Sequence, residues 1–438
     1  VLEFGTDGVR GRANSELNSE FALRLGMSVA NTIAGSTFLV GRDTRVSGTM
    51  LQAAFSAGLA AAGTSVLDLG VIPSPGVAYL CSRLKLAGAV ISASHNPYHD
   101  NGIKILGPAG AKLSNATEIE IERGVRDGIA IDEGVGTIND ASHLVSDYLT
   151  YITSQPLIQS LVGLKLVLDT ANGAASGFAR EVFERYGASV VVINDSPDGV
   201  NINANAGSTH LQGLIDTVLA EKADLGLGFD GDADRVLAVA QDGSVIDGDI
   251  ILGVLAKFLN SRSLLSHNGL AITVMSNMGL RIAMAQANIV VVETPVGDRH
   301  VFEAMERHGF VLGGEQSGHI ILADLAATGD GMLTGAVFSR ALLESGIAAS
   351  ELANRTMVRF PQILRNVACV GDPKVVLGAP EVKDVIARAA QQLSDAGRVL
   401  VRPSGTEPLI RVMVEARDEA LATESIELIL KVISQTDL

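Results

Sequence analysis

The chain has 438 residues, 47% of them apolar, so it is long enough for three or four domains of ordinary size and too long for a single core. Its formal charge of -16 argues against a nucleic-acid or anionic-membrane partner, because an acidic protein gains nothing there from counterion release. Aromatic residues make up only 4%, with no tryptophan, which leaves no stacking platform for bases.

The chain opens with a glycine-rich loop at residues 4–11, Phe-Gly-Thr-Asp-Gly-Val-Arg-Gly. Such a loop could carry Arg10 to a transferring phosphoryl group. A loose N-terminal turn is the plainer interpretation of the same residues.

A strand, a loop, a helix and a second strand then follow one another three times. The first strands are expected at 37–40, 165–169 and 271–275, and the second strands at 65–69, 188–193 and 288–292. Apolar, β-branched runs that alternate with helices predict parallel strands, buried on both faces and joined by right-handed crossovers. We expect three similar α/β domains with mainly parallel sheets around a central cleft, at residues 1–150, 151–248 and 249–360.

The last part of the chain, residues 361–438, has a different pattern. It predicts a strand, a helix at 380–396, strands at 399–402 and 409–414, and a closing helix from Glu419. Antiparallel pairing around the loop between these strands would make a smaller C-terminal α+β domain. Such a domain could act as a lid.

Each of the three repeats has a further short strand that runs into an unusual loop. The strands are expected at 88–91, 223–227 and 309–312, and the loops are 92–97, 230–235 and 313–319. In open parallel sheets the ligand crevice lies beyond the carboxyl ends of the strands, so the three loops can converge if the domains face one cleft.

The second of these loops places Asp230, Asp232 and Asp234 at alternate positions and closes with Arg235. Three carboxylates so close together repel one another unless a cation is bound, and such oxygen ligands suit Mg²⁺ together with a substrate phosphate. A calcium loop fails on spacing, because its sixth and twelfth positions would be Arg235 and Gln241. An acidic solvated turn is the remaining alternative.

The loop at 92–97 contains Ser94 in Ser-Ala-Ser-His-Asn-Pro, where a serine is usually a turn residue bonded to the backbone. The continuation after an Asn-Gly turn brings Lys104 back toward the same loop. A serine hydroxyl needs activation by a base, a metal or a charge. With Mg²⁺ and Lys104 nearby, a phosphoserine at Ser94 could be both formed and spent.

The loop at 313–319 ends in His319, which follows glycines and polar residues instead of occupying an apolar helix face. Its near-neutral pKa suits proton transfer, although a satisfied core imidazole is the alternative. Glu315 and Ser317 could bind sugar hydroxyls, and for Glu315 a plain surface charge is the alternative.

The C-terminal loop combines a guanidinium, two hydroxyls and backbone amides freed by a glycine, which suit an anion. These groups belong to Arg402, Ser404, Gly405 and Thr406, with Arg411 as reinforcement. A turn between two strands would use similar residues.

The N-terminal residues show neither a basic n-region nor an apolar h-region, so we expect no secretory signal. Cys81 and Cys369 lie far apart without CxxC spacing, which fits two inert thiols in a reducing compartment. The uncharged segment 47–67 is rich in Ala and Gly, and we interpret it as a buried helix and a strand. We expect a cytoplasmic protein and leave open whether it forms a homodimer.

With these loops in this order, the chain resembles the α-D-phosphohexomutase superfamily along almost its whole length. The motifs that carry the resemblance are 5–11, 92–97, 230–235, 314–319 and 402–408. The resemblance implies that Ser94 is the phosphoserine and binds Mg²⁺ with the three aspartates. It also implies that Glu315 and Ser317 hold the sugar, and that the 402–406 loop grips the phosphate that is not reacting.

Within the superfamily, the chain is most similar to the enzymes that act on glucosamine phosphates, partly because Gln316 stands where relatives acting on mannose or glucose phosphates often carry methionine. The implied reaction converts glucosamine 6-phosphate to glucosamine 1-phosphate through a hexose 1,6-bisphosphate, which also serves as activator. Arg10, Lys104 and Arg235 would stabilise charge, and Lys104 or His319 would move the proton.

Three other functions stay open on the sequence alone: a mutase for mannose or glucose phosphates, a magnesium phosphatase, and a non-catalytic binder of sugar phosphates. One departure from the family is Pro295, where many relatives carry lysine. Contacts from the third domain to sugar or phosphate are therefore an open point.

Overall fold

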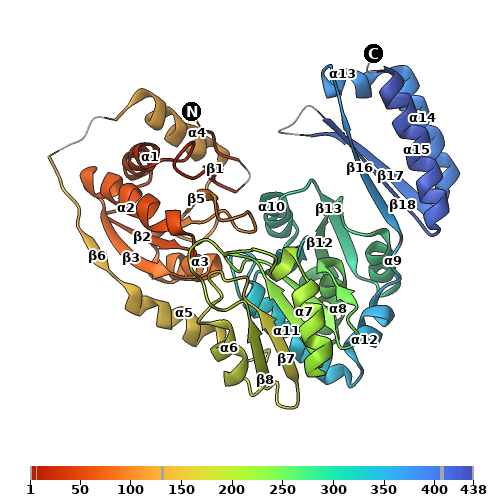
Figure 1. Ribbon diagram of the computed structural model, residues 1–438, viewed down its shortest axis with the longest axis horizontal. Coiled ribbons are helices and arrows are strands. Elements are labelled where there is room, and N and C mark those ends of the chain that lie inside the picture. The colour runs from red at the N-terminus through yellow and green to blue at the C-terminus, as the bar shows by residue number, and fades with distance from the viewer. Residues whose placement is uncertain (1, 6, 130–132, 405–408, 437–438) are drawn as a thin grey trace. The chain divides into compact units, whose positions relative to one another are not determined.

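The computed structural model describes residues 2–5, 7–129, 133–404 and 409–436. Figure 1 follows the chain from its N-terminus, in red, to its C-terminus, in blue. Two compact units are present: one contains residues up to 275 together with 288–356, and the other contains 276–287 together with the residues from 357 onward. The first unit carries three α/β sheets.

The first sheet has the strand order β1-β5-β4-β2-β3-β6. Its strands are β1 (Val9–Arg12), β2 (Thr37–Arg42), β3 (Ser65–Val71), β4 (Ala87–Ile91), β5 (Asp100–Leu106) and β6 (Ile138–Asp140). Strands β2, β3, β4 and β6 run parallel, whereas β5 pairs antiparallel with both β4 and β1. The mainly parallel sheet that the sequence predicts is confirmed here.

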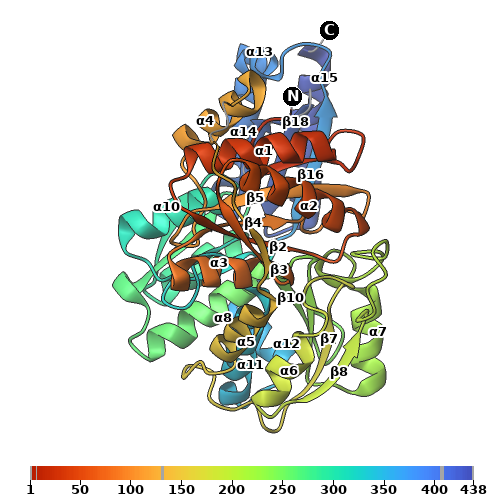
Figure 2. The ribbon, with the colours of Figure 1, turned by 90° about the vertical axis from the view of Figure 1, so that its left-hand side faces the viewer.

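Helices cover both faces of this sheet, because alternate strand residues point to opposite sides. Phe38 and Val40 of β2 pack with α1 and α2, whereas Leu39 between them packs with α3. The helices are α1 (Ser19–Thr32), α2 (Val46–Ala61), α3 (Ser74–Leu84), α4 (Asn115–Asp127) and α5 (Val145–Ile152). Figures 1 and 2 both show α1 beside α2.

The second sheet has the order β11-β10-β9-β7-β8, with β7, β8 and β9 parallel and β10 and β11 antiparallel. Its elements are β7 (Lys165–Asp169), α6 (Ala179–Arg185), β8 (Ser189–Ile193), α7 (Gln212–Glu221), β9 (Leu225–Phe229), β10 (Val236–Ala240) and β11 (Val245–Ile246). Figure 2 shows α6 and α7 on opposite sides of β7 and β8. The metal-type loop 230–235 is the connection from β9 to β10.

The third sheet has the order β13-β12-β14-β15, and only β15 runs antiparallel to its neighbour. Its elements are β12 (Gly269–Thr273), β13 (Val290–Thr294), α10 (Asp298–His308), β14 (Leu312–Gly314) and β15 (Ile320–Leu322). Three more helices of the first unit are α8 (Gly248–Ser261), α11 (Gly331–Ser345) and α12 (Ala349–Thr356).

Strands β13 and β14 begin two and three residues later than the sequence pattern predicts. Asn288 has a φ of +56° and Gly309 a φ of +67°, so both lie in the left-handed region and cannot extend a strand. Gly309 instead ends α10, which explains why the strand starts only after it.

The second unit is a three-stranded antiparallel sheet of order β16-β18-β17, covered by helices. Its elements are α9 (Met278–Gln286), β16 (Gln362–Ala368), α13 (Pro373–Gly378), α14 (Pro380–Leu393), β17 (Gly397–Pro403), β18 (Leu409–Ala416) and α15 (Glu419–Thr436). The predicted antiparallel pairing of the strands around the C-terminal loop is confirmed.

Helix α9 belongs to the second unit through specific contacts. The Asn277 side chain donates to the Phe360 carbonyl at 2.9 Å and accepts from the Phe360 amide at 3.0 Å. The Met278 amide donates to Glu415 at 3.3 Å, and Arg398 donates to the Ser276 carbonyl at 2.5 Å.

Among the residues that the structure describes, none of the helices combines the length and apolar character that a membrane crossing needs.

Candidate active site

The loop after β4 places Ser94 against the loop after β9. Ser94 is fully buried, and its hydroxyl donates to Asp230 Oδ2 at 2.5 Å. Its φ of +52° lies in the left-handed region, which is costly for a residue with a Cβ and is typical of functional sites. The two loops come from different sheets, so the convergence expected from the strand ends occurs in the folded chain.

The three aspartates form one buried cluster. Asp230, Asp232 and Asp234 each offer an oxygen within 4.8 Å of the others. Burial and the two neighbouring carboxylates raise the pKa of Asp230 well above its usual value. Within the part of the chain that the structure describes, one oxygen each of Asp232 and Asp234 is buried without a hydrogen-bond partner, and that of Asp234 lies 3.6 Å from His319 Nδ1 and 3.7 Å from Arg235 Nε. An all-oxygen donor set with this charge and these open positions fits a hard divalent cation.

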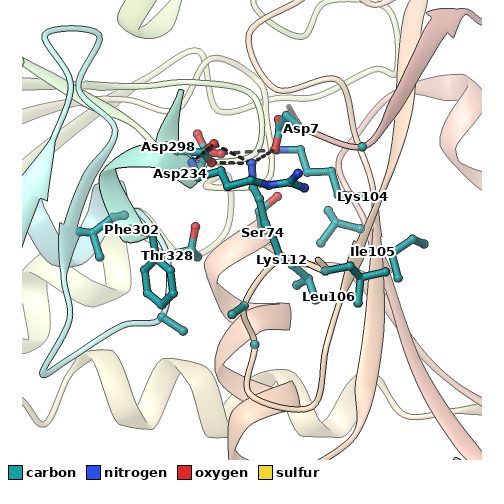
Figure 3. Close-up of a pocket in the computed structure, with 18 of the residues that line it drawn as sticks. Asp7, Ser74, Lys104, Ile105, Leu106, Lys112, Asp234, Asp298, Phe302 and Thr328 are labelled. Atoms are coloured by element: carbon teal, nitrogen blue, oxygen red, sulfur yellow. Dashed lines mark hydrogen bonds and ion pairs between the residues drawn. The ribbon is translucent and has the colours of Figure 1, made fainter. Parts of the chain in front are cut away.

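Lys104 on β5 is the cation closest to this cluster. Its ammonium lies 2.8 Å from Asp232, 2.9 Å from Asp7 and 3.4 Å from Asp234, as Figure 3 shows for Asp7 and Asp234. Burial alone would lower the pKa of Lys104, but the carboxylates hold this pKa well above its usual value. The Lys104 ammonium donates hydrogen bonds to Asp232 and Asp234 in this arrangement.

His319 lies directly before β15, with its ring between two carboxylates. Nδ1 is 3.6 Å from Asp234 and Nε2 is 3.7 Å from Asp298. Burial lowers the pKa of His319, but Asp234 and Asp298 outweigh it and raise this pKa. Burial raises the pKa of Asp234, but Lys104 and His319 outweigh this effect and lower the pKa below its usual value.

Two guanidinium groups line a cavity of about 390 Å³ next to the cluster. Arg10 on β1 pairs with Asp7, and Arg235 lies 3.7 Å from Asp234. Burial acts against the charge of Arg235, but Asp234 and Asp230 raise its pKa above the usual value. Arg235 therefore carries positive charge beside the aspartates, and the Arg10 guanidinium lines the same cavity.

Glu315 lines the same cavity, with one carboxylate oxygen accepting the Gly297 amide at 3.1 Å. Ser317 is exposed and donates to Glu315 at 3.4 Å. Val296, Gly297 and Asp298 also line the cavity, so the segment after Pro295 does face the site.

The predicted phosphate cradle lies in the second unit. Arg402 and Arg411 are register partners on β17 and β18, and the Ser404 amide donates to the Leu409 carbonyl at 2.8 Å. Burial and Arg411 lower the pKa of Arg402. Gly405 and Thr406 lie outside the described residues.

Several residues of the site were not predicted from the sequence. Lys112 bridges Asp7 at 2.9 Å and Asp298 at 2.7 Å, which joins the first sheet's domain to α10 (Figure 3). The Ser74 hydroxyl donates to Asp232 at 2.6 Å. Only Asp7, within the first glycine-rich motif, carried a signal in the sequence.

The chain matches four domain families described as phosphoglucomutase/phosphomannomutase. Alpha/beta/alpha domain I matches residues 1–130, domain II matches 146–243, domain III matches 247–360, and the C-terminal domain matches 364–432. These four domains, with the buried serine and aspartate cluster, place the chain in the class of phosphohexose mutases.

Among the curated relatives, a phosphoglucosamine mutase of Pelotomaculum thermopropionicum is 46% identical over 444 residues, which cover 99% of each chain. The chain belongs to the phosphoglucosamine mutase family.

Two solved structures share the fold. A phosphoglucomutase/phosphomannomutase family protein of Burkholderia thailandensis superposes with a TM-score of 0.83 at 24% identity, over 98% of this chain and 97% of the other. An N-acetylphosphoglucosamine mutase of Aspergillus fumigatus, in complex with GlcNAc-6P and magnesium, superposes with a TM-score of 0.70 at 17% identity. The match covers 100% of this chain and 96% of the other.

Proposed function

We infer that this isomerase interconverts glucosamine 6-phosphate and glucosamine 1-phosphate through a phosphoserine at Ser94 and a 1,6-bisphosphate. The observation that carries the proposal is the 2.5 Å contact between the Ser94 hydroxyl and Asp230, within a buried cluster of three carboxylates. A hydroxyl held against a cation-type site can receive and release a phosphoryl group.

The reaction consists of two transfers in opposite directions. In the first, the bond between phosphorus and Oγ of phosphorylated Ser94 breaks, a bond to the C1 hydroxyl oxygen of the sugar forms, and the hydroxyl proton leaves to a base. In the second, the C6 phosphoryl group passes to Ser94 Oγ, and the released C6 oxygen takes up a proton. Between them the bisphosphate turns around in the cleft.

Mg²⁺ is the cation that we assign to Asp230, Asp232, Asp234 and Ser94. When bound, it would neutralise the charge of the transferring phosphoryl group. The open oxygens of Asp232 and Asp234 and the raised pKa of Asp230 support this assignment, because a cation would relieve both.

The cations around Ser94 take complementary roles in the proposal. Arg10 and Arg235, which line the cavity, stabilise the phosphoryl charge during transfer. Lys104, paired with three carboxylates, donates a hydrogen bond to the oxygen that leaves, and it is the first candidate for moving the hydroxyl proton. His319 is the second candidate for proton transfer.

Substrate binding is assigned to two groups of residues. Glu315 and Ser317 hold sugar hydroxyls beside the cavity. The phosphate that is not reacting binds the C-terminal loop, through Arg402, Ser404, Gly405, Thr406 and Arg411.

Sugar specificity is tested with coupled assays on glucosamine, glucose and mannose 6-phosphates. We expect the highest kcat/KM for glucosamine 6-phosphate. A strong preference for a neutral hexose would favour the phosphoglucomutase/phosphomannomutase alternative, and release of inorganic phosphate without isomer would favour a phosphatase.

The role of Ser94 is tested by Ser94→Ala, with Ser146→Ala as control because Ser146 is an exposed serine on α5. We expect loss of at least about 10³-fold in kcat for the first variant, since it removes the hydroxyl to which the proposal assigns the phosphoryl group, and none for the second. Chelation of divalent ions should abolish turnover of the parent protein, and Mg²⁺ should restore it. Retained turnover in Ser94→Ala would refute the assignment.

Two further expectations remain predictions. The described cysteines, Cys81 and Cys369, are both buried free thiols, which is compatible with a cytoplasmic location. Size measurement in solution would decide whether the chain forms a homodimer.

A further inference from the structure

We propose that Arg45 and Asn203 are positioning residues that hold Ser94 in its left-handed conformation and so aim its hydroxyl at the aspartate cluster. The inference rests on the proposed function, since it concerns how the phosphoserine loop is held. Neither residue touches the reacting atoms.

Arg45 lies directly before α2, in the short connection that follows β2, and its side chain is completely buried. Its guanidinium donates to the carbonyls of Ser94 and Asn96, each at 2.8 Å, and to Asp100 at 3.1 Å. It also donates to the Pro97 carbonyl. One side chain thus binds three carbonyls of the loop after β4 and the carbonyl of Asp100 at the start of β5, which a planar set of donors can do and an ammonium cannot.

Asp43 binds this guanidinium and is also linked to the Ser94 amide through the Ser92 hydroxyl. Arg45 Nε donates to Asp43 at 2.8 Å, and the Ser92 hydroxyl donates to the same carboxylate oxygen at 2.6 Å. The Ser92 hydroxyl oxygen in turn accepts the Ser94 amide at 2.9 Å. The amide and the carbonyl of Ser94 are therefore both held by one buried network.

Asn203 completes the arrangement from the second sheet's domain. Its side-chain amide donates to the Ser94 carbonyl at 2.9 Å and to the Asn96 carbonyl at 3.0 Å, the same two oxygens that Arg45 binds. A Cβ on Gly231 would lie 2.6 Å from the Ser94 carbonyl, so the metal-type loop packs directly on this point. The network connects the loop that holds Ser94 to the loop that holds Asp230, which accepts the Ser94 hydroxyl bond.

A left-handed φ at a serine persists only where the surroundings over-determine it. The four hydrogen bonds that Arg45 and Asn203 donate to the Ser94 and Asn96 carbonyls supply that constraint. Without them, the serine would relax toward a more common backbone conformation and its hydroxyl would leave Asp230.

The test uses Arg45→Lys and Asn203→Ala in the full chain. Arg45→Lys keeps the positive charge but loses the planar set of N–H donors. Asn203→Ala removes the side-chain amide that donates to the Ser94 and Asn96 carbonyls. Val218→Ala, a truncation in the core of the second domain, is the control for a general loss of stability.

The first measurement is the rate at which glucose 1,6-bisphosphate phosphorylates Ser94, followed by intact and peptide mass spectrometry. In this step a phosphorus–oxygen bond of the bisphosphate breaks, a bond to Oγ forms, and the hydroxyl proton of Ser94 ends on the released sugar oxygen.

We expect phosphorylation and kcat to fall together, about 30-fold or more for Arg45→Lys and about 10-fold for Asn203→Ala. KM for the sugar phosphate should change less than about threefold, because the groups assigned to the sugar and to the non-reacting phosphate are untouched. Val218→Ala should lower Tm and leave both rates unchanged.

Rates within threefold of the parent in folded Asn203→Ala and Arg45→Lys would overturn the inference, and the asparagine variant decides alone if the lysine variant fails to fold. Equal loss of rate in Val218→Ala would also overturn it, because stability would then account for the effect. A parent protein that takes no phosphoryl group would overturn the proposed function itself.

Discussion

Buried charges at the site are unevenly paired, because one ammonium contacts three carboxylates. Lys104 pairs with Asp232, Asp234 and Asp7, whereas Asp230 accepts hydrogen bonds from the Ser94 hydroxyl and the Arg235 amide and is attracted by the Arg235 charge. Burial and the neighbouring carboxylates raise the pKa of Asp230, and a bound cation would lower it again by stabilising the ionised form.

Asp330 is a second buried carboxyl group with a raised pKa, and it gives a prediction about stability. It caps α11 by accepting the Leu333 amide at 2.9 Å, and it accepts the Tyr148 hydroxyl at 2.8 Å. Burial raises its pKa from 3.8 to about 6 despite these bonds. The folded protein thus binds this proton more tightly than the unfolded chain, so the stability contributed by Asp330 is lost as pH rises from about 4 to about 6.

Asp330→Asn keeps the cap and removes the charge. Relative to the parent, this variant should gain up to about 3 kcal/mol in free energy of unfolding between pH 4 and pH 7, since two pKa units correspond to about that energy. Urea unfolding of both proteins at several pH values measures the difference. A difference that does not vary with pH would show that Asp330 titrates normally.

At the scale of elements, helices α1 and α2 cross with their backbones in close contact. A Cβ on Gly26 would lie 2.2 Å from the Phe55 carbonyl, and one on Gly58 would lie 2.1 Å from the Leu23 carbonyl. Both obstacles are backbone atoms, which cannot move aside as a flexible side chain can. The two glycines permit this crossing.

Gly26→Ala should therefore destabilise the protein by about 1–3 kcal/mol through overpacking. Gly213→Ala is the matched control, because Gly213 lies in α7 and a Cβ there would meet nothing within 4 Å. The control should stabilise by about 0.5–1 kcal/mol, the usual gain from replacing a helical glycine. Thermal and urea unfolding would measure both, and a neutral Gly26→Ala would mean that the helices can separate freely.

The elements also show how far the sequence could predict the structure. Apolar periodicity located the strands within a few residues, and the errors at β13 and β14 came from left-handed residues that the apolar pattern does not reveal. The rule that ligands bind beyond the carboxyl ends of strands predicted that the loops of Ser94 and Asp230 converge. The same rule did not identify Arg45, because its partners are backbone carbonyls 49 or more residues away, which carry no side-chain signature.

At the scale of the whole molecule, the chain passes between the two units at three places, after residues 275, 287 and 356. Helix α9 is therefore part of the second unit, although β12 and β13, its neighbours in sequence, lie in the first. Glu415, fully buried, accepts from Arg398 and from the Met278 amide, and this network attaches α9 to β17 and β18.

We expect the amides of α9 to exchange with solvent together with those of β16 to β18 in moderate denaturant. Arg398→Ala should lower protection in both, because it leaves the Glu415 carboxylate buried without this cation, a loss of about 3 kcal/mol or more. Arg180→Ala, at an exposed pair with Glu184, is the control and should leave protection unchanged. Hydrogen exchange with mass spectrometry makes the comparison, and α9 exchanging with β12 instead would contradict it.

The attachment of α9 has a consequence for proteolysis. A protease that cleaves once after Thr356 would not release the C-terminal fragment, because residues 276–287 remain continuous with the rest of the chain on both sides. The Asn277 and Phe360 bonds and the Glu415 network would retain the fragment after the peptide bond is cut. The nicked protein would separate into two pieces only after denaturation.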